Sequence, residues 1–135
     1  DDHLFNTSIR ENLKIANPDA DDVTIMSILD AVELSDLIKS LPDGLDTHIG
    51  AFGKNFSGGE LQRMRLARAL LRHSPIYVLD EPLEHLESVQ ALRIFENIRQ
   101  QLSGSTIIVI SHEEIPDVTN SVSLKPDFNQ AIRAN

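Results

Sequence analysis

The sequence predicts an α/β fold in which a helical first half leads into a parallel βαβ unit. Residues 76–79 form a short continuous apolar run, and residues 106–110 are β-branched throughout. Both patterns are typical of strands that are buried on two faces. Between them, residues 88–102 form a long amphipathic stretch with Val89, Leu92, Phe95, Ile98 and Leu102 directed inward. A strand, a helix and another apolar strand in this order indicate a parallel crossover.

The helices of the first half are predicted from capping patterns and apolar stripes. Residues 8–11 (Ser-Ile-Arg-Glu) form a capping box, in which a serine and a glutamate satisfy the free N–H groups that begin a helix. A second helix is expected over residues 22–32, and Ser35 is expected to cap a short third one. Pro42-Asp43-Gly44 predicts a turn. Helical periodicity returns over residues 59–73.

Composition limits the classes of protein that fit. The chain has 135 residues, of which 41% are hydrophobic, so it can bury a core and corresponds to one domain or a large piece of one. Its formal net charge of -9 argues against a nucleic-acid partner, whose binding surface is usually basic. There is no cysteine, which excludes disulfides and thiolate metal sites. No apolar run approaches the roughly 20 residues of a membrane helix.

A serine and two glycines precede the helix predicted over residues 59–73. Small residues at a helix start leave backbone N–H groups accessible, and the helix dipole favours an anion there. Ser57 adds a hydroxyl donor to Gly58 and Gly59. A plain N-cap with flexible glycines explains the same three residues, and on their own they are weak evidence. Their continuation as Glu-Leu-Gln-Arg (residues 60–63) and Ala-Arg-Ala-Leu (residues 67–70) favours an anion site.

Polar residues follow both predicted strands. Asp80 and Glu81 end the first, and two adjacent carboxylates there suit metal-phosphate chemistry. The first carboxylate can hold Mg²⁺, directly or through water, and the second can orient or deprotonate an attacking water. The alternative is that they only terminate the strand. His112 follows the second strand, where its imidazole could touch a γ-phosphate, although a lone histidine is more often structural or solvated.

Three segments occur in an order and spacing that resemble an ABC-type ATPase. Residues 56–62 (Phe-Ser-Gly-Gly-Glu-Leu-Gln) resemble the ABC signature, residues 76–82 (Ile-Tyr-Val-Leu-Asp-Glu-Pro) the Walker B strand, and Ser111-His112 the switch-histidine region. No Gly-x-x-x-x-Gly-Lys-Ser/Thr phosphate loop occurs in the chain. The resemblance extends over roughly residues 1–125.

This resemblance implies a partial P-loop NTPase (RecA-like) core with parallel strands, together with an α-helical ABC signature subdomain. Residues 1–73 would be the helical subdomain, residues 74–125 part of the ATPase core, and residues 126–135 a C-terminal tail. The implied cofactors are ATP and Mg²⁺.

The resemblance also assigns a role to each candidate residue. Asp80 would be the Walker B aspartate that holds the metal, Glu81 the catalytic glutamate and His112 the switch histidine. The signature residues would bind ATP held by the opposite subunit; these are Ser57, Gly58, Gly59 and Glu60.

The implied function is that of an ATP-hydrolysing part of an ABC transporter, which couples hydrolysis to export. Its implied partners are a second nucleotide-binding domain, in a homodimer or a heterodimer, and a transmembrane domain in the same full-length chain. The location would be the cytoplasmic face of the inner membrane. Without a phosphate loop, this segment alone is expected to be soluble and inactive. A soluble ABC ATPase of DNA repair or translation, and a non-enzymatic regulatory half-site, are the alternatives.

Finer features resemble particular exporters and also depart from the family pattern. Residues 8–13 and 41–47 resemble exporter-type half-transporters. Glu60, together with Glu-Pro-x-Glu-x-Leu at residues 81–86, resembles the thiol-exporting half-transporters linked to cytochrome bd assembly. Glu60 replaces the commoner Gln, Ala51 stands where exporters often carry Glu, and residues 83–87 replace the usual D-loop. Whether both ATP sites of a dimer are equally active is therefore open.

Overall fold

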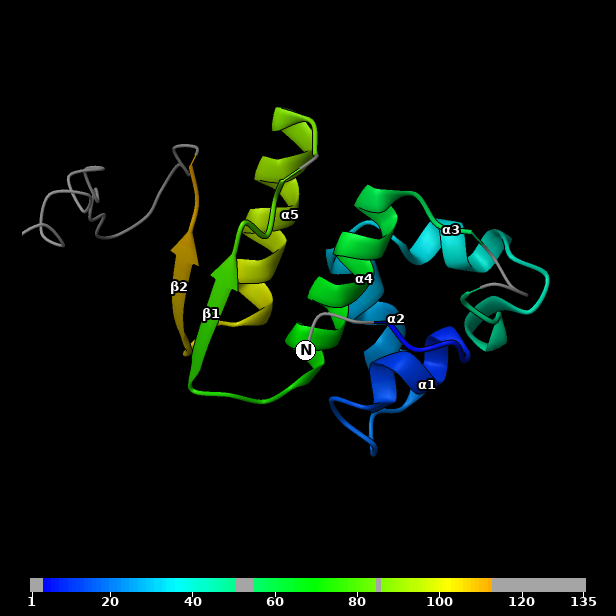
Figure 1. Ribbon diagram of the computed structural model, residues 1–135. Helices are drawn as coiled ribbons and strands as arrows, with labels where there is room; N and C mark the ends of the chain where they lie inside the picture. Colours follow the sequence, from blue (N-terminus) through cyan, green and yellow to red (C-terminus); the bar gives the residue numbers. More distant parts are fainter. Residues whose placement is uncertain (1–3, 51–54, 85, 113–135) are drawn as a thin grey trace, which may run out of the picture.

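The computed structural model describes residues 4–50, 55–84 and 86–112, and Figure 1 shows how their helices and strands are arranged. The elements follow one another as α1 (Ile9–Lys14), α2 (Asp22–Ala31), α3 (Ser35–Ser40), the 3₁₀ turn η1 (Gly44–Asp46), α4 (Gly58–Leu71), β1 (Ile76–Asp80), α5 (Ser88–Gln101) and β2 (Thr106–Ile110). The predicted order of helices and strands is confirmed. Ala51, residue 85 of the segment that replaces the usual D-loop, and the tail expected at residues 126–135 lie outside the described residues.

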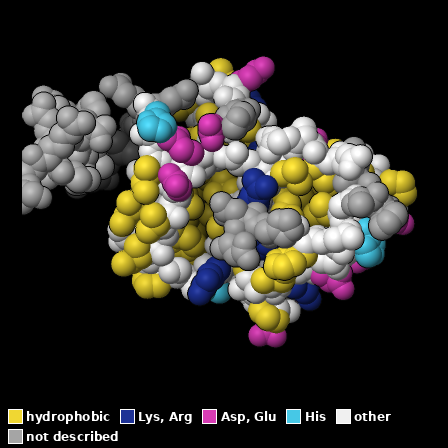
Figure 2. Space-filling view, in the orientation of Figure 1, with side chains coloured by type: hydrophobic (Ala, Val, Ile, Leu, Met, Phe, Trp, Pro, Cys, Tyr) yellow, Lys and Arg dark blue, Asp and Glu magenta, His cyan; other side chains and the backbone are white. Residues whose placement is uncertain are grey.

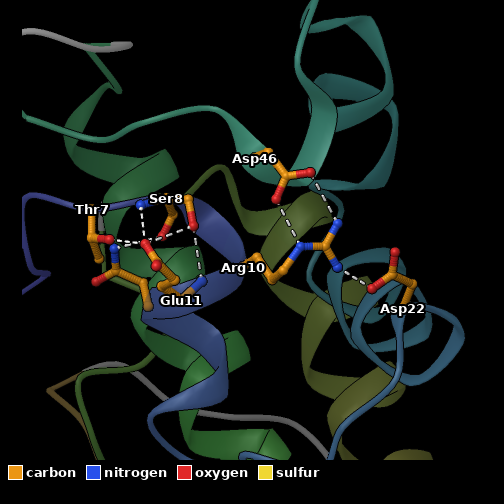
Figure 3. Close-up of polar contacts among 7 residues, drawn as sticks. Thr7, Ser8, Arg10, Glu11, Asp22 and Asp46 are labelled. Carbon is orange, nitrogen blue, oxygen red and sulfur yellow. Dashed lines mark hydrogen bonds and ion pairs between the residues drawn. The ribbon is translucent and has the colours of Figure 1, made fainter.

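The first helix begins at the predicted capping box. The Ser8 hydroxyl accepts from the Glu11 backbone N–H at 3.1 Å, and the Glu11 carboxylate accepts from the Ser8 N–H at 3.1 Å. On the opposite side of α1, Arg10 donates to Asp46 of η1 at 2.8 Å and also to Asp22 at the start of α2 (Figure 3). The hydrogen bond to Asp46, and to a smaller extent the one to Asp22, raises the pKa of the Arg10 guanidinium. The Arg10–Asp46 hydrogen bond also lowers the pKa of the Asp46 carboxyl group. Arg10 therefore ties α1, α2 and η1 together.

The third helix corrects one expectation about its cap. Ser35 is the first residue of α3, while Leu34 occupies the cap position with no side-chain hydrogen bond. The Ser35 hydroxyl instead donates to Asp30 at 2.6 Å. Since Ser35 is buried, this contact with the preceding helix satisfies its hydroxyl.

The helices and the βαβ unit share one hydrophobic core. Leu13 of α1, Leu29 of α2, Met64 of α4 and Ile98 of α5 are each 0% exposed and belong to the same cluster. Helix α4 packs against both α1 and α2, and α5 packs against α2. This shared core fixes α4, which begins in the signature-like segment of residues 56–62, relative to the strand that ends in Asp80.

The two strands form a parallel pair with α5 as the crossover, as predicted. Their register runs from Ile76 opposite Thr106 to Asp80 opposite Ile110. The prediction that both strands are buried on two faces is wrong. Tyr77 and Leu79 face the core, whereas the side chains between and beside them are open; these are Ile76, Val78, Ile108 and Ile110. Among the described residues the helices cover one face of the sheet, and Figure 2 shows hydrophobic side chains over the other.

Helix α5 also departs from prediction in its first turns. Phe95, Ile98 and Leu102 are buried as expected, but Val89 is 68% exposed and Leu92 is 47% exposed. The beginning of α5 extends past the ends of the strands in Figure 1, so its first turns do not lie against the sheet. Ile94, which was not predicted, is fully buried instead. In the part of the chain that is described, no helix has both the length and the apolar character needed to cross a membrane.

Candidate functional site

The carboxyl ends of the two strands bring Glu81 next to Ser111 and His112. Because Asp80 pairs with Ile110, the residues that follow the two strands emerge at the same edge of the sheet. The Glu81 carboxylate accepts from the His112 backbone N–H at 2.9 Å and from the Ser111 hydroxyl at 3.3 Å. The His112 imidazole Nε2 lies 3.5 Å from the same carboxylate. In Figure 2, acidic side chains and a histidine gather at this end of the strands.

The backbone of Glu81 is left-handed, with φ of +43°. This region costs a non-glycine residue about 1–2 kcal/mol because Cβ approaches the carbonyl oxygen. Three hydrogen bonds hold the neighbouring peptide groups. The Glu81 N–H donates to the Ile110 carbonyl at 2.9 Å, and the Glu81 carbonyl accepts from the Glu84 N–H at 3.2 Å and from Gln62 Nε2 at 2.7 Å. The turn that carries Glu81 is thus supported by β2, by the following loop and by α4.

Asp80 is the last residue of β1, and its side chain is exposed. Within the described ranges, no group of three or more His, Cys, Asp or Glu side chains is arranged to hold a metal ion. Mg²⁺ in nucleotide sites is usually held by one or two carboxylates, with substrate phosphates and water completing its shell. An exposed Asp80 followed by Glu81 fits that donor set, although it does not form a cage of protein ligands.

The start of α4 is closed by a second capping box. Ser57 is the N-cap; its hydroxyl accepts from the Glu60 N–H at 3.3 Å, and the Glu60 carboxylate accepts from the Ser57 N–H at 2.7 Å. The N–H groups of Gly58 and Gly59 begin the helix, where no preceding turn supplies a carbonyl. Gly58 is exposed, and a Cβ placed on it would meet no described atom within 4 Å. Packing within the described chain therefore does not require glycine there, and the position leaves room for an anion or another surface.

Glu60 places a negative charge in the same first turn. Its carboxylate occupies the Ser57 N–H, which is then not available to a bound anion. The structure therefore contains both the plain N-cap and the accessible helix start that the sequence left as alternatives. It does not bring Ser57 into contact with Glu81.

Sequence reasoning missed Gln62 and Glu33. Gln62, one turn into α4, connects the signature helix to the carbonyl of Glu81. The sequence feature that could have indicated a role for Gln62 is its position as the last residue of the signature-like segment, residues 56–62. The carboxylate of Glu33, which has φ of +56°, accepts from Arg93 at 2.8 Å and from Gln90 at 2.9 Å. The Arg93 hydrogen bond lowers the pKa of Glu33. Nothing in the local sequence pointed to this contact, which joins the end of α2 to α5.

Arg63, which directly follows Gln62 on α4, does not lie on a solvated face of the helix. Its side chain is half-buried and donates to the Gly59 carbonyl at 3.3 Å and to the Glu33 carbonyl at 3.2 Å. Since α4 packs against α2, a long side chain at this position is enclosed between the two helices. Arg63 therefore stabilises the helical half.

A parallel βαβ unit with a carboxylate pair at its strand end, joined to a helical unit with a glycine-rich helix start, defines a partial P-loop NTPase domain. Residues 1–84 match the family described as "ABC transporter", and the chain belongs to this family.

Relatives and a solved structure agree with this membership. The chain is 43% identical over 110 residues to the "Glutathione/L-cysteine transport system ATP-binding/permease protein CydD" of Bacillus subtilis (strain 168), matching 82% of this chain and 19% of that protein. It is 36% identical over 110 residues to the corresponding CydC protein of Escherichia coli (strain K12), with the same shares covered. A bacterial Atm1-family ABC exporter with ATP bound has a TM-score of 0.73 at 33% identity, covering 82% of this chain and 19% of that one. The chain thus spans about a fifth of the length of these two relatives.

Proposed function

We propose that this chain is part of the nucleotide-binding domain of an ABC exporter, in which ATP hydrolysis drives transport across a membrane. One observation carries the proposal: Glu81 is held at the end of β1, with its carboxylate fixed by Ser111 and His112. Membership of a family whose matched relatives are ATP-binding/permease proteins supports it. In this proposal, residues 1–73 form the helical subdomain, residues 74–125 belong to the ATPase core, and residues 126–135 are a tail.

Glu81 is the proposed general base. Each carboxylate oxygen has two lone-pair sites, so the bonds from Ser111 and the His112 N–H leave acceptor capacity for a proton of the attacking water. The same bonds keep the carboxylate from rotating, and a fixed base is in position before the reaction begins. The His112 imidazole lies beside the Glu81 carboxylate and is almost fully exposed, so it is accessible to the γ-phosphate.

Asp80 is the proposed residue for Mg²⁺, which neutralises charge on the phosphates when it is bound. Its exposed carboxylate lies beside Glu81 at the strand end, where substrate phosphates would complete the metal's ligands.

The start of α4 is proposed to complete an ATP site that belongs to a second nucleotide-binding domain. The exposed Ser57 and Gly58, together with the N–H of Gly59, present donors at a positive helix end. No described atom lies within 4 Å of a Cβ placed on Gly58, which would allow close approach by a phosphate of the partner's ATP. Glu60 shapes this turn through the capping box. The second domain could belong to an identical or a related subunit.

The exported substrate is proposed to be a small thiol compound such as glutathione or cysteine. The similarity to CydD and CydC, both named as parts of a glutathione/L-cysteine transport system, supports this choice. The transmembrane domain would lie in the same full-length protein, as in these ATP-binding/permease relatives, with this part at the cytoplasmic face of the membrane. Uptake of labelled glutathione into inverted membrane vesicles containing the full-length exporter tests the substrate; no ATP-dependent uptake of glutathione or cysteine would refute it.

The proposed hydrolysis is tested by replacing Glu81 with glutamine in the full-length exporter. ATP turnover should fall by roughly 10²-fold or more, because an amide cannot accept the water's proton, while ATP binding persists. Glu96→Gln is the matched control, since Glu96 is exposed on α5 and pairs with Arg99. If Glu81→Gln hydrolyses ATP at the wild-type rate, Glu81 is not the base.

A further inference from the structure

Two local effects oppose the backbone conformation of Glu81. A left-handed φ of +43° is unfavourable for any side chain with a Cβ. The next residue is Pro82, and a residue that precedes proline is pushed toward extended backbone. Conformations of this kind persist where surrounding contacts hold them. The direction of the Glu81 side chain follows from this backbone, so the groups that hold the backbone also aim the carboxylate.

One of these groups is a side chain from another element. Gln62 of α4 donates through Nε2 to the Glu81 carbonyl at 2.7 Å across 19 positions of sequence. The amide must present its NH₂ group here, because a carbonyl oxygen only accepts hydrogen bonds. The side chain is half-buried, so competition from water is reduced. The remaining backbone contacts of Glu81 come from β2 and from its own turn, so Gln62 is the contact from the signature helix.

Gln62 also lies within the first two turns of α4, close to the Ser57–Gly59 turn in sequence. It lies three positions after Gly59 on the same continuous helix, which begins at Gly58. The first turns of a continuous helix move as one rigid body. A displacement of the Ser57–Gly59 turn would therefore move Gln62 as well, and with it the hydrogen bond to the Glu81 carbonyl.

We propose that Gln62 is a positioning residue, which holds the Glu81 carboxylate in its reactive orientation and couples the start of α4 to the base of the same subunit. This inference rests on the proposed function, in which Glu81 is the general base. Through Gln62, contact of the α4 start with the partner's ATP would influence hydrolysis in the subunit's own site.

The test is Gln62→Glu in the full-length exporter, because a carboxylate cannot donate and repels the Glu81 carbonyl. Loss of one oriented hydrogen bond should lower kcat by about tenfold. The KM for ATP should stay within about twofold, since in this proposal Gln62 acts on the base through the Glu81 carbonyl and does not bind the nucleotide. Gln62→Met, which has similar length and no added charge, carries the same expectation if the glutamate variant does not fold.

A matched control is Gln90→Glu. Gln90 is also half-buried and donates to a carboxylate, that of Glu33, at 2.9 Å, but it does not touch Glu81. This variant should lower the Tm and leave kcat unchanged. If kcat falls equally in the Gln62 and Gln90 variants, and in proportion to the loss of Tm, the effect of Gln62 on the rate is a general loss of stability. That result would overturn the proposal.

A double-mutant cycle separates this inference from the proposed function. If Gln62 acts through Glu81, adding Gln62→Glu to Glu81→Gln should change the residual rate by less than about twofold. A further tenfold loss in that background, or a wild-type kcat for Gln62→Glu alone, would refute the coupling while Glu81 remains the base. A wild-type rate for Glu81→Gln alone would refute the proposed base and, with it, this inference.

Discussion

The start of α4 and the end of β1 are the two candidate functional regions of the chain, and different kinds of contact hold them. At α4, Ser57 and Glu60 close a capping box across three positions of sequence. At β1, the Glu81 carboxylate is held by Ser111 and His112, which lie 30 and 31 positions away. The first is a local motif, and the second exists only once the two strands pair.

This difference separates the functions that each region can serve. The capping box satisfies two N–H groups of the helix start by itself, and no described atom lies within 4 Å of the place that a Cβ on Gly58 would take. As far as the described residues go, this turn is accessible to another molecule. The Glu81 turn is held by hydrogen bonds to β2, to Gln62 and within its own loop. Its geometry therefore depends on how β1, β2 and α4 are placed relative to one another. Changes at α4 should therefore affect the composite ATP site, and changes around Glu81 should affect the rate of chemistry.

The largest effect is expected from Ser57→Arg in the full-length exporter. A long cationic side chain at the exposed helix start should block closure on the partner's ATP, and ATP turnover should fall by roughly 10²-fold or more. Photolabelling with an ATP analogue should still mark the mutated subunit, because its own phosphate loop is untouched.

Ser103→Arg is the control for the introduced charge. Ser103 is exposed and follows the C-terminal end of α5. The other end of α5, which follows the Asp80–Glu81 turn in the chain, is about 20 Å away along the helix axis. Turnover should be unchanged there. If Ser57→Arg abolishes labelling of its own subunit while the partner site still hydrolyses ATP, the assignment of the α4 start to the partner's site is wrong.

The second prediction concerns both regions together in the present chain. Without a Gly-x-x-x-x-Gly-Lys-Ser/Thr segment, the backbone N–H groups and lysine that make most phosphate contacts are absent. Calorimetric titration with Mg-ATP should show affinity no better than about millimolar, or ~4 kcal/mol. A longer piece of the same exporter that includes its phosphate loop should bind far more tightly under the same conditions. Micromolar binding by the present chain would contradict the prediction.

The same contrast explains what the sequence could reveal. The capping box of residues 8–11 could be predicted because its members lie within one turn, and the βαβ order followed from the hydrophobic pattern. At Ser57 the sequence predicted a plain N-cap as one alternative but missed the reciprocal hydrogen bond from Glu60. The contacts of Gln62 with Glu81 and of Glu33 with Arg93 could not be read, because they depend on how α2, α4 and α5 pack. The exposure of Val78 and Ile108 was also missed, because an apolar strand does not reveal which of its faces the described residues cover.

A third prediction compares the same substitution in the two regions. Ser57→Ala removes the cap of α4 and should lower the free energy of unfolding by about 1 kcal/mol. Ser111→Ala removes one donor to the Glu81 carboxylate and leaves the His112 N–H in place, so kcat should fall about three- to tenfold with little change in Tm. Thermal unfolding and steady-state kinetics of both full-length variants measure this. A Ser111→Ala variant that loses stability but keeps its kcat would reverse the assignment.

The smallest effect is expected from Glu60→Gln. The glutamine Oε1 can still accept from the Ser57 N–H, so the box persists while its negative charge is removed. A charge at a helix N-terminus is worth about 0.3–1 kcal/mol, so an ATP phosphate bound there should be favoured and the KM for ATP should fall by about two- to fivefold. Glu11→Gln makes the same change in the capping box of α1 and should leave KM unaltered. If Glu60→Gln instead raises KM, the carboxylate itself contributes to nucleotide binding, and the start of α4 is more than a cap with accessible N–H groups.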